Sequence, residues 1–174
     1  AAFTAWNFPA ALVARKVAPA LAAGCSVVVR PSSQTPGVAM VMVDCCRAGG
    51  VPAGAVNLVV GPTEATYAPL MAAKVSLTGS TRVGQQMIRD AAATLKKVSM
   101  ELGGNAPVIV YDDADLEAAL NVAVPTKFAN AGQVCVTGDR FFVHERLHDA
   151  FVTGFVDRAR AFGLGDGLDP AVVM

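Results

Sequence analysis

Two residues that could carry out covalent catalysis stand in informative contexts in this sequence. Cys135 ends the run Gly132-Gln133-Val134-Cys135, and Glu101 lies 34 residues earlier, at the start of Glu-Leu-Gly-Gly-Asn (101–105). A thiolate attacks carbonyl carbons, and a carboxylate can activate water as a general base. This pair predicts catalysis through a thioester, with Cys135 as nucleophile and Glu101 as base.

Each of these residues also has a plainer interpretation. A lone cysteine is more often a small buried hydrophobe than a nucleophile. Cys135 follows a glycine-containing break after a predicted helix, where a side chain can face a cleft, whereas Cys25, Cys45 and Cys46 lie in apolar or helical surroundings and are interpreted as packing residues. For Glu101 the alternative is an exposed carboxylate in a turn, and spacing alone does not establish its reach.

A third candidate is Asn7, in the run Trp6-Asn7-Phe8-Pro9. Its side-chain amide could pair with the backbone N–H of Cys135 and hold the oxyanion formed when the thiolate attacks a carbonyl. The alternative is an ordinary turn asparagine before a helix.

The composition excludes several kinds of partner. Fourteen basic and fourteen acidic residues cancel, so no charged surface for nucleic acid or a membrane is indicated. Charged residues make up 16% of the chain, against about 25% in typical soluble domains, which predicts that much of the surface is covered. The absence of a starting Met and of a signal peptide pattern indicates mid-chain sequence. No C-x-x-C spacing occurs, so neither a disulfide framework nor a metal site is expected, and a reducing cytoplasmic location fits best.

The elements that must position these residues alternate between strand and helix. Apolar, β-branched runs bounded by glycine and proline, with helical runs between them, predict an α/β fold with a mostly parallel, Rossmann-like sheet covered by helices on both faces. Strands are predicted at 26–30, 55–60, 74–77, 98–101, 108–111 and 141–143, and helices at 36–48, 63–72, 82–94, from the acidic caps at 112–115 to 128, and at 144–162. A boundary near residue 100 would separate part of a nucleotide-binding domain (1–100) from the start of a second, catalytic α/β domain (101–174).

Five motifs, in this order along the chain, resemble those of the aldehyde dehydrogenase superfamily. The detailed sequence is most similar to the succinate-semialdehyde dehydrogenase branch of that superfamily. The five motifs are WNFP (6–9), RPSSQTP (30–36), LTGSTRVG (77–84), MELGGNAP (100–107) and GQVC (132–135). The resemblance implies that the chain is an internal part of a longer enzyme, inactive by itself, and that the full-length protein is a homo-oligomer acting on a small aldehyde.

The resemblance also implies a division of roles. Cys135 attacks the aldehyde, Asn7 and the Cys135 amide hold the oxyanion, hydride passes to a nicotinamide, and Glu101 activates water to hydrolyse the thioester. Lys16 joins a proton relay behind Glu101, although a solvated helix lysine is an equal alternative. Arg15 matches one of two arginines that clamp the substrate carboxylate in the branch.

The expected cofactor is NADP or NAD. Gly79 and Ser80, at the start of a helix after a strand, could offer N–H groups to a pyrophosphate. Arg30 ends a strand where parallel-sheet enzymes bind ligands, and stands where the family usually has the lysine that holds the adenosine ribose. Ser33 replaces an acidic residue typical of NAD-preferring members, which favours acceptance of NADP. Family position adds four further contacts, namely Thr4, Trp6, Gly61 and Leu102.

The sequence departs from the branch in ways that leave alternatives open. Ala129 stands where the second substrate-binding arginine is expected, so succinate semialdehyde is in doubt and a less polar aldehyde is an alternative. Thr137 replaces a second cysteine found in several relatives, and the segment 61–74 is short. A non-catalytic nucleotide-binding or assembly fragment is a second hypothesis. A CoA-acylating relative is a third, disfavoured because such members generally lack a base at the position of Glu101.

Overall fold

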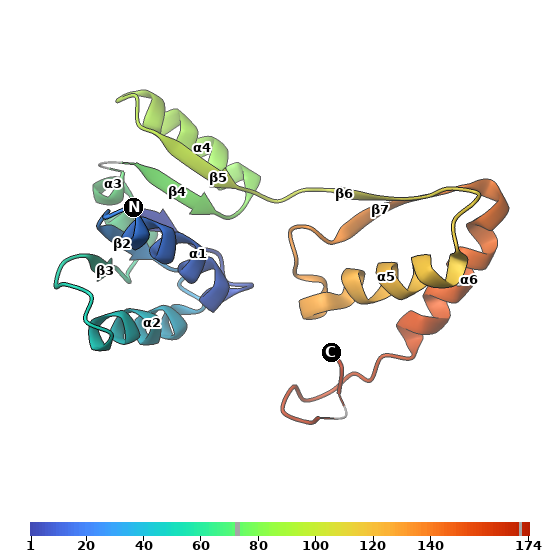
Figure 1. The fold of residues 1–174 in the computed structure, drawn as a ribbon. Coiled ribbons are helices and arrows are strands. Elements are labelled where there is room, and N and C mark those ends of the chain that lie inside the picture. The colour runs from blue at the N-terminus through green and yellow to red at the C-terminus, as the bar shows by residue number, and fades with distance from the viewer. Residues whose placement is uncertain (72–73, 171) are drawn as a thin grey trace. The chain divides into compact units, whose positions relative to one another are not determined.

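The structure is a computed structural model that describes residues 1–71, 74–170 and 172–174. The chain divides into two compact units, Ala1–Gly103 and Gly104–Met174. Figure 1 shows the elements of both units in chain order. Each unit is described by itself below.

The first unit is built on a five-stranded parallel sheet with the strand order β3-β2-β1-β4-β5. Its strands are β1 (Ala2–Phe3), β2 (Val27–Arg30), β3 (Val56–Leu58), β4 (Val75–Thr78) and β5 (Val98–Glu101). Its helices are α1 (Pro9–Ala22), α2 (Pro36–Ala48), α3 (Thr63–Leu70) and α4 (Thr81–Ala92). This architecture confirms the predicted α/β fold with a parallel sheet.

Helices cover both faces of this sheet, as predicted. Successive strand residues point to opposite faces. Ala2 therefore packs in one core cluster with Val13 and Val17 of α1, whereas Phe3 packs in the other with Met87 and Ala91 of α4. The first cluster also contains Val27, Val29 and, from α2, Ala39, and the second contains Met71, Val75 and Leu77.

The central strand β1 was not predicted from the sequence. Only Ala2 and Phe3 form it, which is too short for a period-two pattern to be recognised. Pairing on both sides creates the strand, because Ala2 is in register with Val29 of β2 and with Ser76 of β4.

The predicted elements that the structure contains have ends moved by up to three residues. The longest shift is at the strand predicted for 141–143, which begins at Gly138. The helix predicted for 63–72 ends at Leu70, and residue 72 lies outside the described residues. Propensity is a weak guide at element ends, where caps and pairing decide.

Strand order places a topological switch point between β1 and β4. The chain runs from β1 through β2 to β3 on one side, and β4 then returns to pair with the other side of β1. In open parallel sheets, ligands bind outside the carboxyl ends of the strands at such a point. The loops that follow β1 and β4 are therefore the expected walls of a ligand crevice.

The second unit has two parallel strands, β6 (Ala106–Val110) and β7 (Gly138–Val143), with helices α5 (Leu116–Phe128) and α6 (Glu145–Arg160) and the 3₁₀ turn η1 (Ala129–Gly132). The Asp115 carboxylate accepts a hydrogen bond from the Ala118 N–H, which confirms an acidic cap at the start of α5. The core contains Val110, Leu120, Ala123, Val124 and Phe151, with Phe128, Phe141, Phe155 and Phe162 packed against it.

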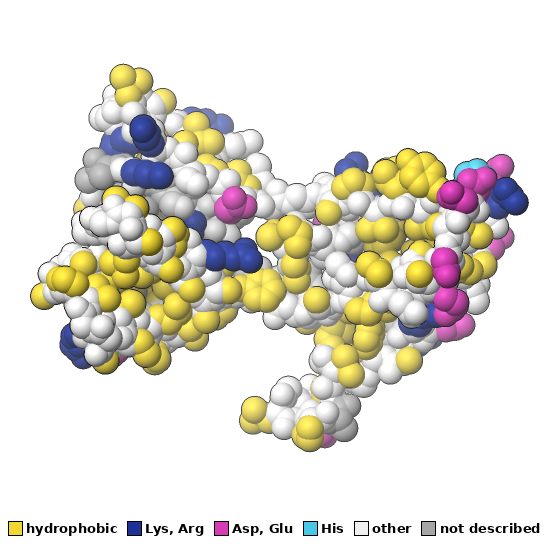
Figure 2. Space-filling model, viewed as in Figure 1, with side chains coloured by type: hydrophobic (Ala, Val, Ile, Leu, Met, Phe, Trp, Pro, Cys, Tyr) yellow, Lys and Arg dark blue, Asp and Glu magenta, His cyan; other side chains and the backbone are white. Residues whose placement is uncertain are grey.

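Each unit carries exposed apolar side chains. Figure 2 shows them over α2 in the first unit and beside β6 and β7 in the second. Val41 on α2 is 63% exposed, and Ile109 and Phe142, which are in register on β6 and β7, are 57% and 53% exposed. These exposed apolar faces agree with the low fraction of charged residues in the sequence. Among the described residues, no helix combines the length and apolarity needed to span a membrane.

Candidate active site

The first unit brings most of its predicted site residues to the carboxyl edge of the sheet. The residues that end or follow the five strands are Thr4, Trp6 and Asn7 after β1, Arg30 and Ser33 at β2, Gly61 after β3, Gly79 and Ser80 after β4, and Glu101 and Leu102 at β5. Sequence predicted them one at a time from separate motifs. The strand order is what collects them at one edge.

Lys16 on α1 is bound to the sheet rather than extended into solvent. Its Nζ donates a hydrogen bond of 2.7 Å to the Oγ of Ser76 on β4. Burial lowers the pKa of the Lys16 ammonium from its ordinary value, and the negative charge of Glu101 opposes part of this shift. Lys16 and Glu101 therefore interact electrostatically within the first unit, and the alternative of a solvated helix lysine is not supported.

Thr4 combines burial with an unsatisfied hydroxyl. It is 6% exposed, and its Oγ1 has no hydrogen-bond partner among the described residues. Its N–H donates to the Arg30 carbonyl at 3.2 Å, which fixes the backbone immediately after β1. A buried hydroxyl without a partner is costly, so its place at the switch point suits a polar group of a bound ligand.

The Arg30 guanidinium is held by the segment that begins α3. Its Nη2 donates to the Thr63 Oγ1 at 2.7 Å and to the Gly61 carbonyl at 3.4 Å, and its Nε donates to the Thr66 Oγ1 at 3.4 Å. These contacts orient the cation at the end of β2. Neither threonine was predicted as a site residue, because no local pattern links them to a position more than thirty residues earlier.

The N-terminus of α4 fits the predicted anion site only in part. Ser80 is the N-cap, and its Oγ accepts from the Val83 N–H at 3.3 Å. The Gly79 N–H donates to the Glu101 carbonyl at 3.0 Å. The expectation that Gly79 offers this N–H to a pyrophosphate is therefore wrong, because the sheet uses the donor, and only the N–H groups from Ser80 onward could serve.

Glu101 is the last residue of β5, and its side chain is exposed. The next residue, Leu102, lies over Gly84 of α4, where an added Cβ would come within 2.6 Å of the Leu102 Cδ2. The glycine lets α4 approach the segment that follows Glu101.

In the second unit, Cys135 lies exposed on a turn between η1 and β7. Asn130, Ala131 and Gly132 precede it with φ angles of 50°, 55° and 76°, and two non-glycine residues in this left-handed region indicate local strain. A Cβ added at Gly104 would lie 3.7 Å from the Cys135 carbonyl. The start of the second unit is thus packed against the cysteine turn.

Thr137 holds this turn in place, and Arg140 of β7 binds the segment before β6. The Thr137 hydroxyl, 3% exposed, lies 3.0 Å from the Thr126 carbonyl and 3.2 Å from the Lys127 carbonyl at the end of α5. Arg140 donates from Nε and Nη2 to the Asn105 carbonyl at 3.1 and 2.9 Å. The sequence suggested no role for Arg140 and treated Thr137 only as a missing cysteine.

We expect Thr137→Val to destabilise the full-length protein by about 1–3 kcal/mol, because the isosteric change removes a buried hydroxyl that hydrogen-bonds to the Thr126 and Lys127 carbonyls. Chemical denaturation monitored by fluorescence would measure the loss. Thr153→Val, at an exposed position of α6, is the control and should change stability by less than about 0.5 kcal/mol. Equal effects of the two substitutions would contradict the anchoring role.

The other cysteines differ from their predicted environments. Cys25 and Cys45 are exposed, so the packing interpretation is wrong for them, whereas Cys46 is half-buried against the first core cluster. Cys25 lies within the connection between α1 and β2, and Cys45 lies on α2. The exposure of neither residue could be inferred from apolar neighbours alone. Within the described ranges, no three His, Cys, Asp or Glu residues gather as metal ligands would.

The remaining predicted residues lie near the start of the first unit. Asn7 is half-buried and Trp6 is 44% exposed in the loop between β1 and α1. Arg15 on α1 and Ser33 after β2 are exposed. Pairing of Asn7 with the Cys135 N–H would join the two units and stays a prediction.

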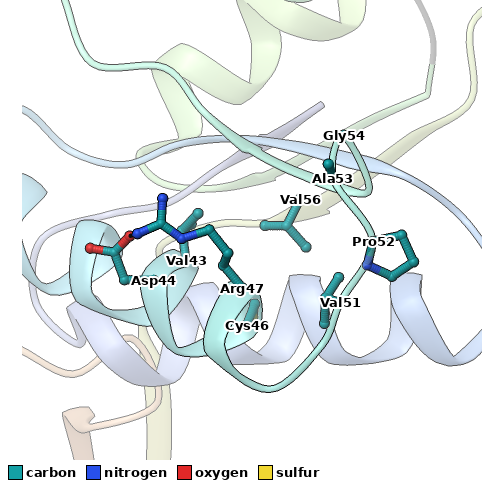
Figure 3. Close-up of a pocket in the computed structure, with 9 residues that line it drawn as sticks. All are labelled: Val43, Asp44, Cys46, Arg47, Val51, Pro52, Ala53, Gly54 and Val56. Atoms are coloured by element: carbon teal, nitrogen blue, oxygen red, sulfur yellow. Dashed lines mark ion pairs between the residues drawn. The ribbon is translucent and has the colours of Figure 1, made fainter.

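A cavity of about 300 Å³ in the first unit lies away from these residues (Figure 3). Residues at the end of α2 and in the connection to β3 line it, among them Cys46, Arg47, Val51 and Val56. Since a helix end and the following strand start lie at the amino edge of a parallel sheet, this cavity is at the edge opposite the predicted site. None of its lining residues was predicted to be functional.

All 174 residues of the chain match the Aldehyde dehydrogenase family. The chain belongs to the aldehyde dehydrogenase family. This confirms the resemblance recognised from the five motifs. The chain is similar to the succinate-semialdehyde dehydrogenase [NADP(+)] of Escherichia coli (strain K12), with 47% identity over 100% of this chain and 37% of the relative. It is also similar to the 3-sulfolactaldehyde dehydrogenase of Pseudomonas putida, with 48% identity over 99% of this chain and 36% of the relative.

Among solved structures, an aldehyde dehydrogenase from Brucella melitensis biovar abortus 2308 matches with a TM-score of 0.96 and 44% identity, over 99% of this chain and 37% of that one. The aldehyde dehydrogenase chain described here thus spans little more than a third of the length of such relatives. This chain and the Brucella melitensis protein share the same fold and family.

Proposed function

We propose that the full-length protein is an NAD(P)-dependent aldehyde dehydrogenase that oxidises a small aldehyde to a carboxylic acid. The observation that carries the proposal is the exposed thiol of Cys135 on a turn anchored by Thr137, in a chain that matches the family throughout. A fixed, accessible thiol is what nucleophilic attack on a carbonyl requires.

The proposed chemistry divides into two halves. The Cys135 thiolate adds to the aldehyde carbon, and the Asn7 amide and the Cys135 N–H hold the resulting oxyanion. A nicotinamide cofactor, held by Thr4, Arg30 and the start of α4, would supply the hydride acceptor that turns the thiohemiacetal on Cys135 into a thioester. Glu101 then removes a proton from water, the water oxygen attacks the thioester carbon, and the thiolate leaves with release of the acid.

Glu101 and Cys135 lie in different units, and the chemistry of the two side chains is what supports a shared role. Convergence of Glu101 and Cys135 on one carbonyl carbon remains part of the proposal.

The residues at the carboxyl edge of the sheet fit a dinucleotide. The Thr4 hydroxyl, which has no partner among the described residues, offers a donor or acceptor, the Arg30 cation offers a positive charge, and the start of α4 offers backbone N–H groups. We assign the cofactor contacts to Thr4, Trp6, Arg30, Ser33, Gly61, Ser80 and Leu102, with Gly79 contributing close backbone approach only. We favour NADP, which the name of the Escherichia coli relative also specifies, and retain NAD as an alternative.

Ser33→Glu should test this preference. A carboxylate beside the 2′-phosphate of NADP should raise its KM at least about tenfold, or about 1.4 kcal/mol, and change the KM for NAD by less than about threefold. Steady-state kinetics with both cofactors would measure the difference. The control is Gln34→Glu, which places the same charge one exposed position further on. A uniform change with both cofactors would mean that Ser33 does not face the 2′-phosphate.

The substrate proposal is a small aldehyde. Arg15 on α1 is exposed and could pair with a distal anionic group, and the names of both relatives specify aldehydes that carry such a group. Ala129, which caps the end of α5, supplies no second cation. A less polar aldehyde is therefore retained beside succinate semialdehyde.

We further propose that the first unit is part of the nucleotide-binding domain and the second is the start of the catalytic domain. We also propose that the full-length protein is a homo-oligomer and that it is located in the cytoplasm. The exposed apolar faces of α2 and of β6 and β7 support a larger assembly.

The test of the proposal is product analysis with purified full-length protein, a panel of anionic and neutral aldehydes, and NADP or NAD. We expect one reduced cofactor for each carboxylic acid formed. Cofactor binding without reduction would favour a nucleotide-binding protein without catalysis. Formation of an acyl-CoA with little acid would favour the CoA-acylating class.

A further inference from the structure

Ser76 is a polar residue on an apolar face of the sheet in the first unit. Its neighbours on β4, Val75 and Leu77, point into the second core cluster, so Ser76 faces the opposite side of the sheet. Its register partner on that side is Ala2, which packs with Val13 and Val17 of α1. Packing alone would favour an apolar residue at position 76.

The hydroxyl of Ser76 has a specific partner. Lys16 reaches it from α1 with an Nζ to Oγ distance of 2.7 Å, and this hydrogen bond is partly buried. An ammonium group taken out of water needs an acceptor, and a hydrogen bond from a charged donor is stronger than one between neutral groups. The bond therefore selects one conformation of a long, flexible side chain.

The same lysine interacts with the proposed general base. Glu101 ends β5, which pairs with β4, and Thr78 of β4 is in register with it. The negative charge of Glu101 raises the pKa of the Lys16 ammonium against the lowering by burial. Helix α1, strand β4 and strand β5 thus bring an ammonium, a hydroxyl and a carboxylate into one electrostatic group inside a single unit.

We propose that Ser76 is a positioning residue for thioester hydrolysis, whose hydroxyl oxygen holds the Lys16 ammonium where it supports the Glu101 carboxylate. This inference rests on the proposed function, and it adds a residue that touches neither substrate nor cofactor. Glu101 accepts the proton from water, and Lys16 in this position orients the carboxylate through the attraction between opposite charges. Without Ser76, Lys16 samples other rotamers and hydrolysis slows, whereas attack by Cys135 is unaffected.

The experiment separates acylation from hydrolysis with an activated ester, p-nitrophenyl acetate, which needs no cofactor. In the full-length protein, the initial burst of p-nitrophenolate reports acylation of Cys135, and the later steady rate reports hydrolysis of the thioester. For Ser76→Ala we expect a burst equal to that of the wild type and a steady rate lower by about tenfold. Ser76→Thr, which keeps a hydroxyl in a strand-compatible side chain, should restore at least half of the rate.

The matched control is Ser99→Ala. Ser99 is exposed on β5 in register with Ser76, and its substitution should leave both phases unchanged. Equal steady rates for the Ser76→Ala and Ser99→Ala variants would overturn the inference. A reduced burst in the Ser76→Ala variant that Thr does not restore would also overturn it, because it would indicate a purely structural role. Absence of both a burst and steady ester hydrolysis in the wild type would instead refute the proposed function, so the two failures are distinguishable.

Discussion

Cys135→Ser in the full-length protein should abolish aldehyde oxidation, with a loss of at least about 10³-fold in kcat. Serine has nearly the same shape, but its hydroxyl is a far weaker nucleophile than a thiolate unless a base activates it. Cofactor binding should persist within about threefold, because the proposed dinucleotide contacts lie at the sheet edge of the first unit. Initial-rate kinetics and fluorescence titration with NADP would measure the two quantities.

The other exposed thiols provide the control for this substitution. Cys25 and Cys45 are exposed, as Cys135 is. Only Cys135 lies on the turn that Thr137 anchors to α5. Cys25→Ser and Cys45→Ser should retain full activity. A Cys135→Ser protein that kept most of its dehydrogenase rate would remove the nucleophile from the proposal.

Glu101→Gln should stop the reaction after acylation. Glutamine keeps the size of the side chain but cannot accept a proton, and loss of a general base typically costs about 10²–10⁴-fold. The first turnover should therefore give a burst of reduced cofactor of normal size, followed by a steady rate lower by at least about 10²-fold. Mass spectrometry should detect an acyl group that remains on Cys135.

The control for Glu101→Gln is Glu64→Gln, which removes a carboxylate from the exposed first turn of α3. It should leave both the burst and the steady rate unchanged. If Glu101→Gln reduced the burst as strongly as the steady rate, the carboxylate would act in the attack by Cys135 rather than in hydrolysis. If it changed neither, another group would be the base.

The parallel sheet was predictable because its strands carry local signals. The runs that became β2 and β4 are short, apolar and bounded by glycine, proline or lysine, and buried parallel strands favour such composition. The capping carboxylate of Asp115 likewise indicated the start of α5. By contrast, Ala2 and Phe3 gave no local signal, because their strand exists only through pairing with β2 and β4.

The candidate site was predictable only for residues with reactive chemistry or a family motif. Cys135, Glu101 and Asn7 are of that kind. Ser76, Thr63, Thr66 and Arg140 were not predicted, because each acts through hydrogen bonds to a residue far away in the sequence. The N–H of Gly79 was assigned to a ligand for a related reason, since its bond to the Glu101 carbonyl depends on the pairing of β4 with β5.

By itself, the sequence determined the class of fold, the family and the residues able to attack a carbonyl or activate water, because composition, local periodicity and motifs are properties of neighbouring residues. Only the tertiary structure decided that Lys16 binds Ser76, that Thr63 and Thr66 orient Arg30, and that Thr137 anchors the Cys135 turn. These contacts depend on strand order and register. Both are set by the burial of whole elements against one another, a collective free energy that no short segment of the chain contains.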